Sequence, residues 1–540
     1  MSNSKSELQV ALFEAANQLR SKMDASEYKD YLLGLIFYKY LSDRSVDYIY
    51  ELKDDEGFKS FPSKDRLTFY TALYNNEDYQ EDVIAELMET FKYAMKPEHT
   101  FDALAEQAFG RAEEPFQLEN LSQGLREIEQ SSPDYVGLFS DMDLNSTRLG
   151  STRAKQSETI ANAIKALAPV DFSNYSGDML GDAYEYLIGE FAMSAGKKAG
   201  EFYTPGRISA IMSRIAMNEE HQNKRGLTVY DPTSGSGSLL LKARYFSEYP
   251  DDIQYYGQEL NTTTYNLARM NMILHGISPS NYRLRNGDTL DEDWPTDEPT
   301  DFDVVVMNPP YSAKWSSDNS FMDDPRFGPY GKLAPKSKAD YAFLLHGYYH
   351  LKNTGTMAIV LPHGVLFRGG AEGTIREKLL KDGAIDAVIG LPANIFHNTS
   401  IPTTIIVLKK DRVERDVLFI DASELYEKDR AQNKLTDEYV DEIVEAYFVR
   451  EDVEKLAHLA SFDEIKENDY NLNIPRYVDT FEQEEPIELT EVSQSINETK
   501  EVIKDLEIEL LGQLNQLVGT DEESQESLSL FISDLKKGMN

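Results

Sequence analysis

Four consecutive residues combine an amide, two rigid prolines and an aromatic ring directly after an apolar run: Asn308, Pro309, Pro310 and Tyr311. Prolines restrict the backbone, so the side-chain oxygen of Asn308 and the carbonyl of Pro309 can face one point. Two converging acceptors suit the two N–H bonds of an exocyclic amino group and turn its lone pair toward an electrophile. Tyr311 offers a ring face on which a base can stack. The four residues predict group transfer to an amino nitrogen, the alternative being a turn that merely ends a strand.

A turn rich in glycine and serine lies upstream, after a short apolar run that ends at Asp231. Its residues are Pro232, Thr233, Ser234, Gly235, Ser236 and Gly237. Glycines let the backbone approach a ligand closely, and the helix predicted to open at Leu239 offers free N–H groups. Leu240 stands where a dinucleotide fingerprint has its third glycine, and the sequence of a P-loop is absent. We interpret the turn as a cofactor-binding loop, the alternative being a plain strand–turn–helix connection.

Two acidic residues follow at the ends of the next two predicted strands. Glu259 is placed to accept both hydroxyl protons of a ribose. Asp288 is placed to accept a hydrogen bond from an adenine amino group, although the preceding Asn-Gly pair is also the commonest tight turn. Asn261 is expected to cap a helix from Thr262 to His275.

These residues require a sheet whose strands end at a common edge. From about residue 160, short β-rich runs alternate with helical ones, and several are almost continuously apolar, as in parallel strands covered on both faces. The predicted strands are 227–230, 254–257, 282–284, 302–307, 356–361, 384–390 and 403–408. Such alternation predicts a doubly wound α/β sheet, which binds ligands beyond the carboxyl ends of its strands.

Helical segments are expected on both sides of this sheet. The N-terminal region has apolar residues at helical spacing (Leu8, Leu12, Ala15 and Leu19) and a stretch, 31–41, that is apolar nearly all round. From about 485 the chain is acidic, with a weak heptad seam at Leu489, Ile496, Ile503, Leu510 and Leu517. We therefore predict a helical domain at 1–155, an α/β domain at 156–480 and a helical tail at 481–540 that docks on a partner or on the N-terminal helices.

Composition limits the chemistry further. The chain has no cysteine, which excludes disulfides, cysteine-ligated metals and a thiolate nucleophile, including the one that cytosine C5 methylation needs. With 54 Lys and Arg against 94 Asp and Glu, the net charge is −40, which argues against binding nucleic acid mainly through bulk charge. The start lacks a signal-peptide pattern, and no apolar run approaches the ~20 residues of a membrane span. We expect a soluble, cytoplasmic protein.

Taken together, the motifs resemble those of S-adenosylmethionine-dependent methyltransferases that act on an amino nitrogen. Upstream of Asp231, the residues Glu201, Phe202, Tyr203, Thr204 and Pro205 match the cofactor-contacting motif of amino-group DNA methyltransferases. Six further stretches resemble the modification subunit of type I restriction–modification systems: 23–29, 33–43, 180–188, 391–396, 399–403 and 470–477. This resemblance covers nearly the whole chain and is weakest after residue 485.

The resemblance implies an α/β, doubly wound, Rossmann-like methyltransferase domain with an all-α N-terminal domain and a helical C-terminal tail. It places S-adenosylmethionine against Glu201 to Gly206, Asp231 to Gly237, Glu259 and Asp288. It also implies methyl transfer, without a metal, to N6 of an adenine flipped out of double-stranded DNA and held by Asn308 to Tyr311. The implied partners are one specificity subunit for two modification subunits, and a motor–nuclease restriction subunit.

Other interpretations stay open. A protein-glutamine or RNA amino-methyltransferase shares the Asn-Pro-Pro-Tyr chemistry, cytosine N4 is a second acceptor that this chemistry allows, and the −40 charge also fits a catalytically idle acidic scaffold. A nicotinamide or flavin oxidoreductase is disfavoured by the missing third glycine. Basic residues after the motif predict either a lip where a DNA duplex meets the cleft or a solvated loop: Lys314, Arg326, Lys332, Lys336 and Lys338.

Overall fold

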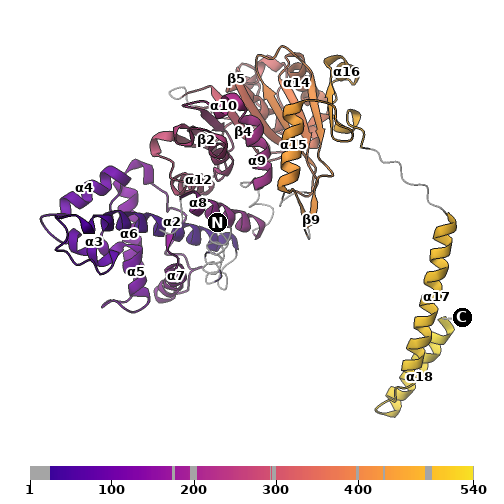
Figure 1. Cartoon of the computed structure of the whole chain (residues 1–540), viewed down its shortest axis with the longest axis horizontal. Coiled ribbons are helices and arrows are strands. Elements are labelled where there is room, and N and C mark those ends of the chain that lie inside the picture. Colours follow the sequence, from indigo (N-terminus) through magenta and orange to yellow (C-terminus); the bar gives the residue numbers. More distant parts are fainter. Residues whose placement is uncertain are drawn as a thin grey trace. The chain divides into compact units, whose positions relative to one another are not determined.

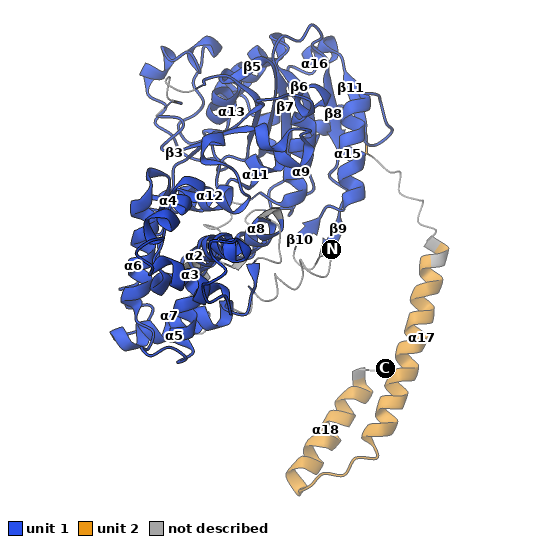
Figure 2. Ribbon diagram, turned by 60° about the vertical axis from the view of Figure 1, so that its left-hand side comes forward, with its two compact units in different colours: residues 1–479 blue, residues 480–540 orange. Residues whose placement is uncertain are grey.

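The computed structural model describes residues 12, 17, 25–172, 177–194, 204–291, 293–294, 299–396, 400–429, 432–480 and 489–538. The chain divides into two compact units, residues 1–479 and 480–540 (Figure 2). The first unit contains a group of helices and a large sheet, and the second contains two helices (Figure 1).

The N-terminal part of the first unit is helical, as predicted. Its helices are α2 (Ala25–Tyr50), α3 (Arg66–Tyr74), α4 (Gln80–Phe91), α5 (Phe101–Ala108), α6 (Leu118–Ser131), α7 (Arg153–Leu167) and α8 (Gly177–Ser194). The stretch 31–41 lies within α2 and is buried apart from half-buried Tyr40, which confirms the predicted core helix. Leu12 is helical and buried, whereas Leu8, Ala15 and Leu19 lie outside the described residues.

The helical core extends past residue 155 and includes an element of the sheet region. The boundary predicted at 155 falls inside α7, whose buried side chains belong to the same apolar cluster as those of α2, α8 and α12 (Thr262–Leu274). Hydrogen bonds also join α12 to the segment 134–137. Asn266 of α12 donates to the Gly137 carbonyl at 3.0 Å, and Arg269 donates to the Asp134 and Val136 carbonyls at 2.7 and 2.9 Å. The helical region is therefore attached to the sheet region through α12.

Within the described residues, nine strands form one mixed sheet in the order β11-β8-β6-β7-β5-β4-β1-β2-β3. The strands are β1 (Thr228–Asp231), β2 (Gln254–Glu259), β3 (Tyr282–Asn286), β4 (Phe302–Met307), β5 (Leu351–Pro362), β6 (Ile385–Gly390), β7 (Thr403–Lys409), β8 (Val417–Asp421) and β11 (Ala457–Ala460). Every predicted strand is present. A separate small hairpin consists of β9 (Glu427–Asp429) and β10 (Gln432–Lys434).

Helices cover both faces of the sheet, which confirms the doubly wound α/β class. They are α9 (Gly206–Ala216), α10 (Glu219–Gln222), α11 (Ser238–Leu241), α12, α13 (Asp340–Tyr349), α14 (Gly370–Lys381), α15 (Asp437–Val449) and α16 (Phe462–Glu467). Successive strand side chains point to opposite faces. Tyr230 and Val305 accordingly join one apolar cluster, with α13 and α14, whereas Val229 and Val304 join another, with α9 and α15.

Strand β7 departs from the expected parallel pattern. It runs antiparallel to both β5 and β6, and β11 runs antiparallel to β8. The strands β1 to β5 pair with one another in parallel. A parallel partner needs a crossover of a dozen or more residues, usually a helix. The segment 391–402 between β6 and β7 contains no described helix, so β7 returns beside β6 in the opposite direction.

The second unit consists of α17 (Leu489–Leu514) and α18 (Glu522–Gly538), which confirms a helical tail. The uninterrupted heptad seam predicted through Leu517 is wrong at its end, because α17 stops at Leu514. Ile496, Ile503 and Leu510 on α17 are 49%, 50% and 44% exposed, so this seam is only partly covered. Across the described part of the chain, every helix is too short or too polar to span a bilayer.

Candidate active site

The predicted motifs meet at the carboxyl ends of two neighbouring parallel strands, β1 and β4. The strand β1 ends at Asp231, and β4 ends at Met307, one residue before Asn308. Pairing of Val229 with Val304 and of Tyr230 with Val305 fixes their register. The strand order reverses at this point of the sheet, where open α/β sheets bind their ligands.

The opposite ends of β1 and β4 are held together by one buried carboxylate, Asp303. The N–H and hydroxyl of Thr228 donate to Asp303 Oδ2 at 3.0 and 2.8 Å, and Lys224 and Lys352 pair with the carboxylate at 2.6 and 3.0 Å. Burial raises the pKa of Asp303, but the hydrogen bonds from Lys224, Thr228 and Lys352 outweigh it and lower the pKa to about 2. The ionised carboxylate therefore fixes the strands that carry Asp231 and Asn308.

The amide of Asn308 is held from both sides. Its Nδ2 donates to Thr204 Oγ1 at 3.1 Å, and its Oδ1 accepts the hydroxyl of Tyr311 at 2.8 Å. A carbonyl oxygen has two lone pairs, so Oδ1 retains an acceptor position. Thr204 thus brings the predicted upstream motif to the predicted catalytic residues, with Pro205 and Gly206 forming the start of α9. Glu201, Phe202 and Tyr203 lie outside the described residues.

Tyr311 is held in place by both its hydroxyl and its ring. Burial, with a contribution from Asp340, raises its pKa well above the ordinary value, so the hydroxyl stays a donor. Its ring packs edge-on against Phe396, with centroids 5.9 Å apart and planes at 87°. The next residue, Ser312, has φ 54° and donates its N–H to Asp340 Oδ1 at 2.8 Å. Phe396 and Asp340 were not among the predicted site residues, and only the fold brings them here.

The turn after Asp231 adopts the tight conformation that its glycines allow. Gly235 and Gly237 have φ values of 54° and 78°, in the left-handed region that favours glycine. Asp231 Oδ1 accepts the N–H and hydroxyl of Thr233 at 2.9 and 3.2 Å. Ser234 donates its N–H to the Gln258 carbonyl at 2.8 Å, so the turn is attached to β2.

Within the same turn, two further side chains pair. The hydroxyls of Ser236 and Ser238 lie 3.0 Å apart. The carbonyl of Pro232 accepts the hydroxyl of Thr289, which attaches the turn to the segment after β3. The helix α11, predicted to open at Leu239, begins one residue earlier and is only four residues long.

Glu259 connects β2 to the glycine turn. Its Oε2 accepts the N–H of Gly235 at 3.0 Å, and its Oε1 accepts the N–H of Asn261 at 2.8 Å. The Asn261 side chain accepts the Thr264 N–H at 3.0 Å, which confirms the predicted cap of α12. Asp288 Oδ1 accepts the Leu290 N–H at 2.9 Å, so this carboxylate stabilises the turn in which it lies.

A cavity of about 620 Å³ is lined by six of the predicted site residues. They are Pro232, Thr233, Glu259, Asp288, Asn308 and Pro310, whereas Thr204 to Gly206, Asp231, Ser234 to Gly237, Pro309 and Tyr311 are not among the lining residues. Chain segments 232–233, 259–264, 287–290 and 308–315 therefore face one space. Pro309 lies between two lining residues and is buried.

Two of the carboxyl groups near the cavity, those of Asp231 and Glu259, have pKa values raised above the ordinary range. Burial raises the pKa of Asp231 to about 7, with Thr233 lowering it and the nearby charge of Glu259 raising it further. Burial also raises the pKa of Glu259, opposed by the N–H groups of Asn261 and Gly235. Such carboxylates favour a ligand that brings positive charge and hydroxyl donors.

The predicted basic lip is only partly at the surface. Arg326 is a correction to that prediction, because it is 2% exposed and lies in the interior. Lys314 lines the cavity and is exposed, as are Lys332 and Lys336, and Lys338 is half-buried. None of these four lysines pairs with a carboxylate within the part of the chain that the structure describes.

The chain matches two family models. Residues 175–486 match the family model described as N-6 DNA Methylase, and residues 8–167 match the model described as HsdM N-terminal domain. A similar curated protein is the type I restriction enzyme MpnII methylase subunit of Mycoplasma pneumoniae. It is 35% identical over 525 residues, which are 92% of this chain and 93% of the relative.

Two solved structures are also similar to this chain. The methyltransferase subunit of a type I restriction–modification system from Streptococcus thermophilus is 59% identical, with a TM-score of 0.84, and the match covers 88% of this chain and 100% of that one. A modification subunit of a type I restriction enzyme from Vibrio vulnificus is 17% identical, with a TM-score of 0.55, and covers 89% of this chain and 99% of that one, so it shares the fold.

Proposed function

The chain belongs to the family of type I restriction–modification methylase subunits and carries their N6-adenine DNA methyltransferase domain, and we propose that it methylates N6 of an adenine flipped out of double-stranded DNA. One observation carries the proposal. Asn308, which supplies acceptors for an amino group, lines the same cavity as Glu259 and Asp288, which suit the ribose and adenine of S-adenosylmethionine. Donor and acceptor sites therefore share one space.

The residues around the cavity fit the cofactor. Each oxygen of Glu259 accepts one backbone N–H and keeps a lone pair for a ribose hydroxyl. Asp288 is proposed to accept the adenine amino group, and Asp231 to Gly237 to contact the methionine portion. Thr204, Pro205 and Gly206 are proposed to complete the site together with Glu201 to Tyr203. When bound, S-adenosylmethionine supplies a methyl group on a positively charged sulfur, which makes a metal or a covalent enzyme intermediate unnecessary.

The target adenine is proposed to lie against Asn308 to Tyr311. Asn308 Oδ1 and the Pro309 carbonyl accept the two N–H bonds of the amino group, so its lone pair faces the methyl carbon. The amino nitrogen would accept the methyl group that S-adenosylmethionine supplies when bound, the sulfur would keep the electrons of the S–C bond, and one amino proton would leave to solvent. Thr204 and Tyr311 fix the Asn308 amide beforehand, so little reorganisation is needed in the transition state. The aromatic ring of Tyr311 is proposed to stack on the base, which offsets part of the few kcal/mol that flipping costs.

The proposed assembly has two of these subunits and one specificity subunit, and it can add a motor–nuclease subunit. The helical region, the sheet region and the helical tail are proposed to serve this assembly, the tail docking through the apolar side chains of α17. A net charge of −40 predicts that the chain binds DNA poorly alone. Lys314, which lines the cavity, and the exposed Lys332 are proposed to contact DNA. We place the assembly in the cytoplasm.

The test is co-expression with the specificity subunit, followed by mapping of methylated bases in the host DNA. We expect N6-methyladenine at one sequence, and none with Asn308→Ala, which should still bind S-adenosylmethionine by calorimetry. Labelled methyl groups found in RNA or in protein glutamine instead of DNA would contradict the proposal. So would a wild-type chain that fails to bind S-adenosylmethionine, the result expected of an idle acidic scaffold.

A further inference from the structure

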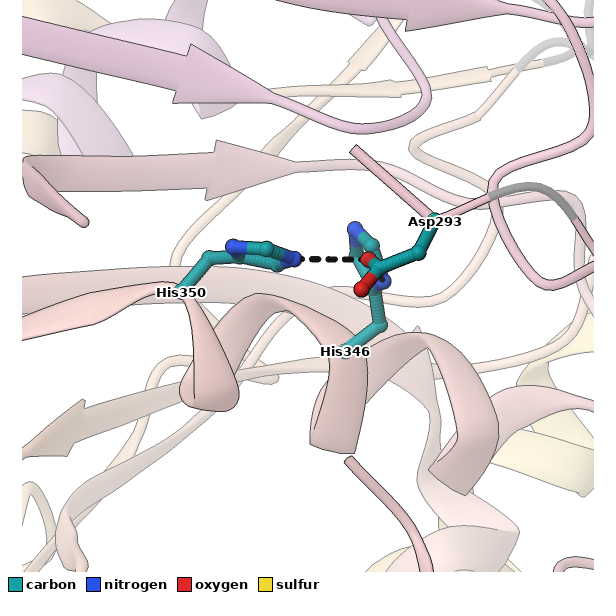
Figure 3. Close-up of side chains that lie close together, drawn as sticks. All are labelled: Asp293, His346 and His350. Atoms are coloured by element: carbon teal, nitrogen blue, oxygen red, sulfur yellow. Dashed lines mark hydrogen bonds and ion pairs between the residues drawn. The ribbon is translucent and has the colours of Figure 1, made fainter. Parts of the chain in front are cut away.

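A cluster of metal-ligand type lies outside the proposed catalytic residues. Asp293, His346 and His350 have potential ligand atoms that all lie within 4.8 Å of one another. Figure 3 shows the imidazole of His346, on α13, and that of His350, directly after the end of α13, close to the Asp293 carboxylate. His350 Nε2 lies 2.9 Å and His346 Nδ1 lies 3.7 Å from Asp293 Oδ1, and both imidazoles are buried. These three side chains by themselves would suit a divalent cation.

The cluster already has a cation, the guanidinium of Arg326. Its Nη1 donates to His346 Nδ1 at 3.1 Å and lies 3.4 Å from Asp293 Oδ1. The His346 lone pair that a metal would need is therefore used. The other ring nitrogen of His346, Nε2, donates to the Tyr230 hydroxyl at 2.9 Å, which donates to Gln258 Oε1 at 2.8 Å. We therefore assign the cluster to Arg326 rather than to a metal.

Arg326 uses its remaining N–H groups to hold one wall of the cavity. Its Nη1 donates to the Thr289 carbonyl at 2.9 Å and its Nη2 to the Leu290 carbonyl at 3.2 Å. Both residues line the cavity beside Asp288. The side chain of Asp324 accepts from Nε and Nη2 at 3.1 and 2.7 Å, which fixes the plane of the guanidinium.

The same guanidinium supports a second wall. Its central carbon lies 4.7 Å from the centre of the Phe327 ring, which lies 5.4 Å from the ring of Trp315. Trp315 lines the cavity and donates its Nε1–H to the Ala334 carbonyl at 3.2 Å. One side chain therefore connects the segment after β3 with the segment after Asn308.

We propose that Arg326 is a positioning residue that sets the spacing between the Thr289–Leu290 wall and the Trp315 wall, and so aligns cofactor and base. This inference rests on the proposed function, in which the first wall belongs to the cofactor and the second lies beside the target base. A planar fork with five donors makes these contacts, and lysine cannot reproduce them. Misplacing reacting groups by about 1 Å lowers a rate by ~10²-fold.

The test compares Arg326→Gln and Arg326→Lys with a matched control, Arg412→Gln. Arg412 also carries a largely covered guanidinium, 10% exposed, which donates to the Gly383 and Ile385 carbonyls at 3.2 and 2.7 Å, but it supports the β6 end of the sheet. All three variants lose guanidinium hydrogen bonds to backbone carbonyls, so a merely structural role predicts the same result for each.

The chain has two tryptophans, and both report on this region. Trp315 is 7% exposed in the second wall, and Trp294 follows Asp293. In a Trp294→Phe background, we expect acrylamide quenching of Trp315 to increase in both Arg326 variants. We also expect S-adenosylmethionine to bind at least ~10-fold more weakly and kcat of the assembled enzyme to fall by up to ~10²-fold, by the misplacement argument. Arg412→Gln should lower the melting temperature but leave quenching and affinity unchanged.

The proposal is overturned if Arg326→Gln keeps the quenching and cofactor affinity of the parent protein. It is also overturned if Arg412→Gln changes both as strongly, or if Arg326→Lys restores them. Quenching of Trp315 requires no methyl transfer. A parent enzyme that does not methylate DNA would therefore refute the proposed function separately, while the quenching comparison still decides whether Arg326 holds the walls.

Discussion

Replacing Tyr311 with phenylalanine removes one hydroxyl and keeps the ring, which separates two roles of this side chain. The hydroxyl donates to Asn308 Oδ1 at 2.8 Å, and without it Thr204 is the partner that the amide keeps among the described residues. A neutral hydrogen bond contributes about 0.5–1.5 kcal/mol net. At roughly 1.4 kcal/mol per factor of ten, Tyr311→Phe should lower kcat by about 2- to 10-fold. Tyr311→Ala also loses base stacking of ~1–3 kcal/mol, a further factor of roughly 5 to 150.

The assay is transfer of labelled methyl groups by the assembled enzyme at saturating DNA, with cofactor affinity measured separately by calorimetry. Neither change at Tyr311 should alter that affinity, because this residue does not line the cavity beside Glu259. Thr204→Val removes the other anchor of Asn308. Either loss alone lets the amide turn. The increase in the activation free energy of methyl transfer in the double variant should therefore be smaller than the sum of the increases in the two single variants.

Several results would refute this reasoning. If Tyr311→Phe is as active as the parent enzyme, the hydroxyl does not orient Asn308. If Tyr311→Phe and Tyr311→Ala are equally impaired, stacking contributes nothing. If the effects of Thr204→Val and Tyr311→Phe on the activation free energy are strictly additive, the two side chains do not act together to orient the Asn308 amide.

Further predictions concern stability, protonation and assembly. Asp303→Asn should destabilise the chain by roughly 2 kcal/mol near neutral pH, because the pKa of Asp303 lies at about 2 rather than 3.8. This contribution is present above about pH 3.8 and is lost toward pH 2, so urea midpoints of variant and parent should converge on acidification. Burial raises the pKa of Asp231 to about 7, so its protonated form stabilises the cofactor-free protein fully below about pH 3.8 and progressively less toward pH 7. The stability of the parent relative to Asp231→Asn should therefore fall over that range and level off above it, as thermal unfolding can measure. Replacing Ile496 and Ile503 with lysine should abolish copurification with the specificity subunit, since each buried apolar side chain is worth about 1.5–3 kcal/mol, and leave cofactor affinity unchanged.

Local patterns in the sequence were enough to predict the strands and several turns. The run at 302–307 is apolar apart from Asp303 and is followed by Asn308, so its burial and its direction toward the site followed from the sequence. Asn261 before a helical pattern likewise predicted the observed cap. The strand β8 was missed although Val417 to Ile420 form an apolar run, whereas β9 and β10 are charged and gave no such signal.

Contacts between distant segments could not be predicted from local patterns. Nothing in the sequence pairs Thr204 with Asn308, because their contact depends on where α9 and β4 meet. A charge count assigned Arg326 to the surface, but composition does not distinguish a solvated guanidinium from one that caps buried carbonyls. The adjacent Phe327 and the nearby Asp324 were the available signals of burial. The described residues between β6 and β7 contain no crossover helix, and β7 therefore runs antiparallel to β6. The pattern of apolar residues in a strand does not indicate the direction in which that strand runs.

The participation of α12 in the helical core determines when that core can close during synthesis. Leu267, Met270 and Ile273 are buried in the same cluster as α2. The ribosome reaches them about 100 residues after the end of α7, a delay of roughly 5–20 s at ordinary elongation rates. During this interval the apolar faces of α2 and α8 lack their cover and are open to chaperones or aggregation. Because β1 and β2 precede α12 in the chain and Asn308 follows it, these two strands have been synthesised when α12 closes the core, whereas Asn308 has not.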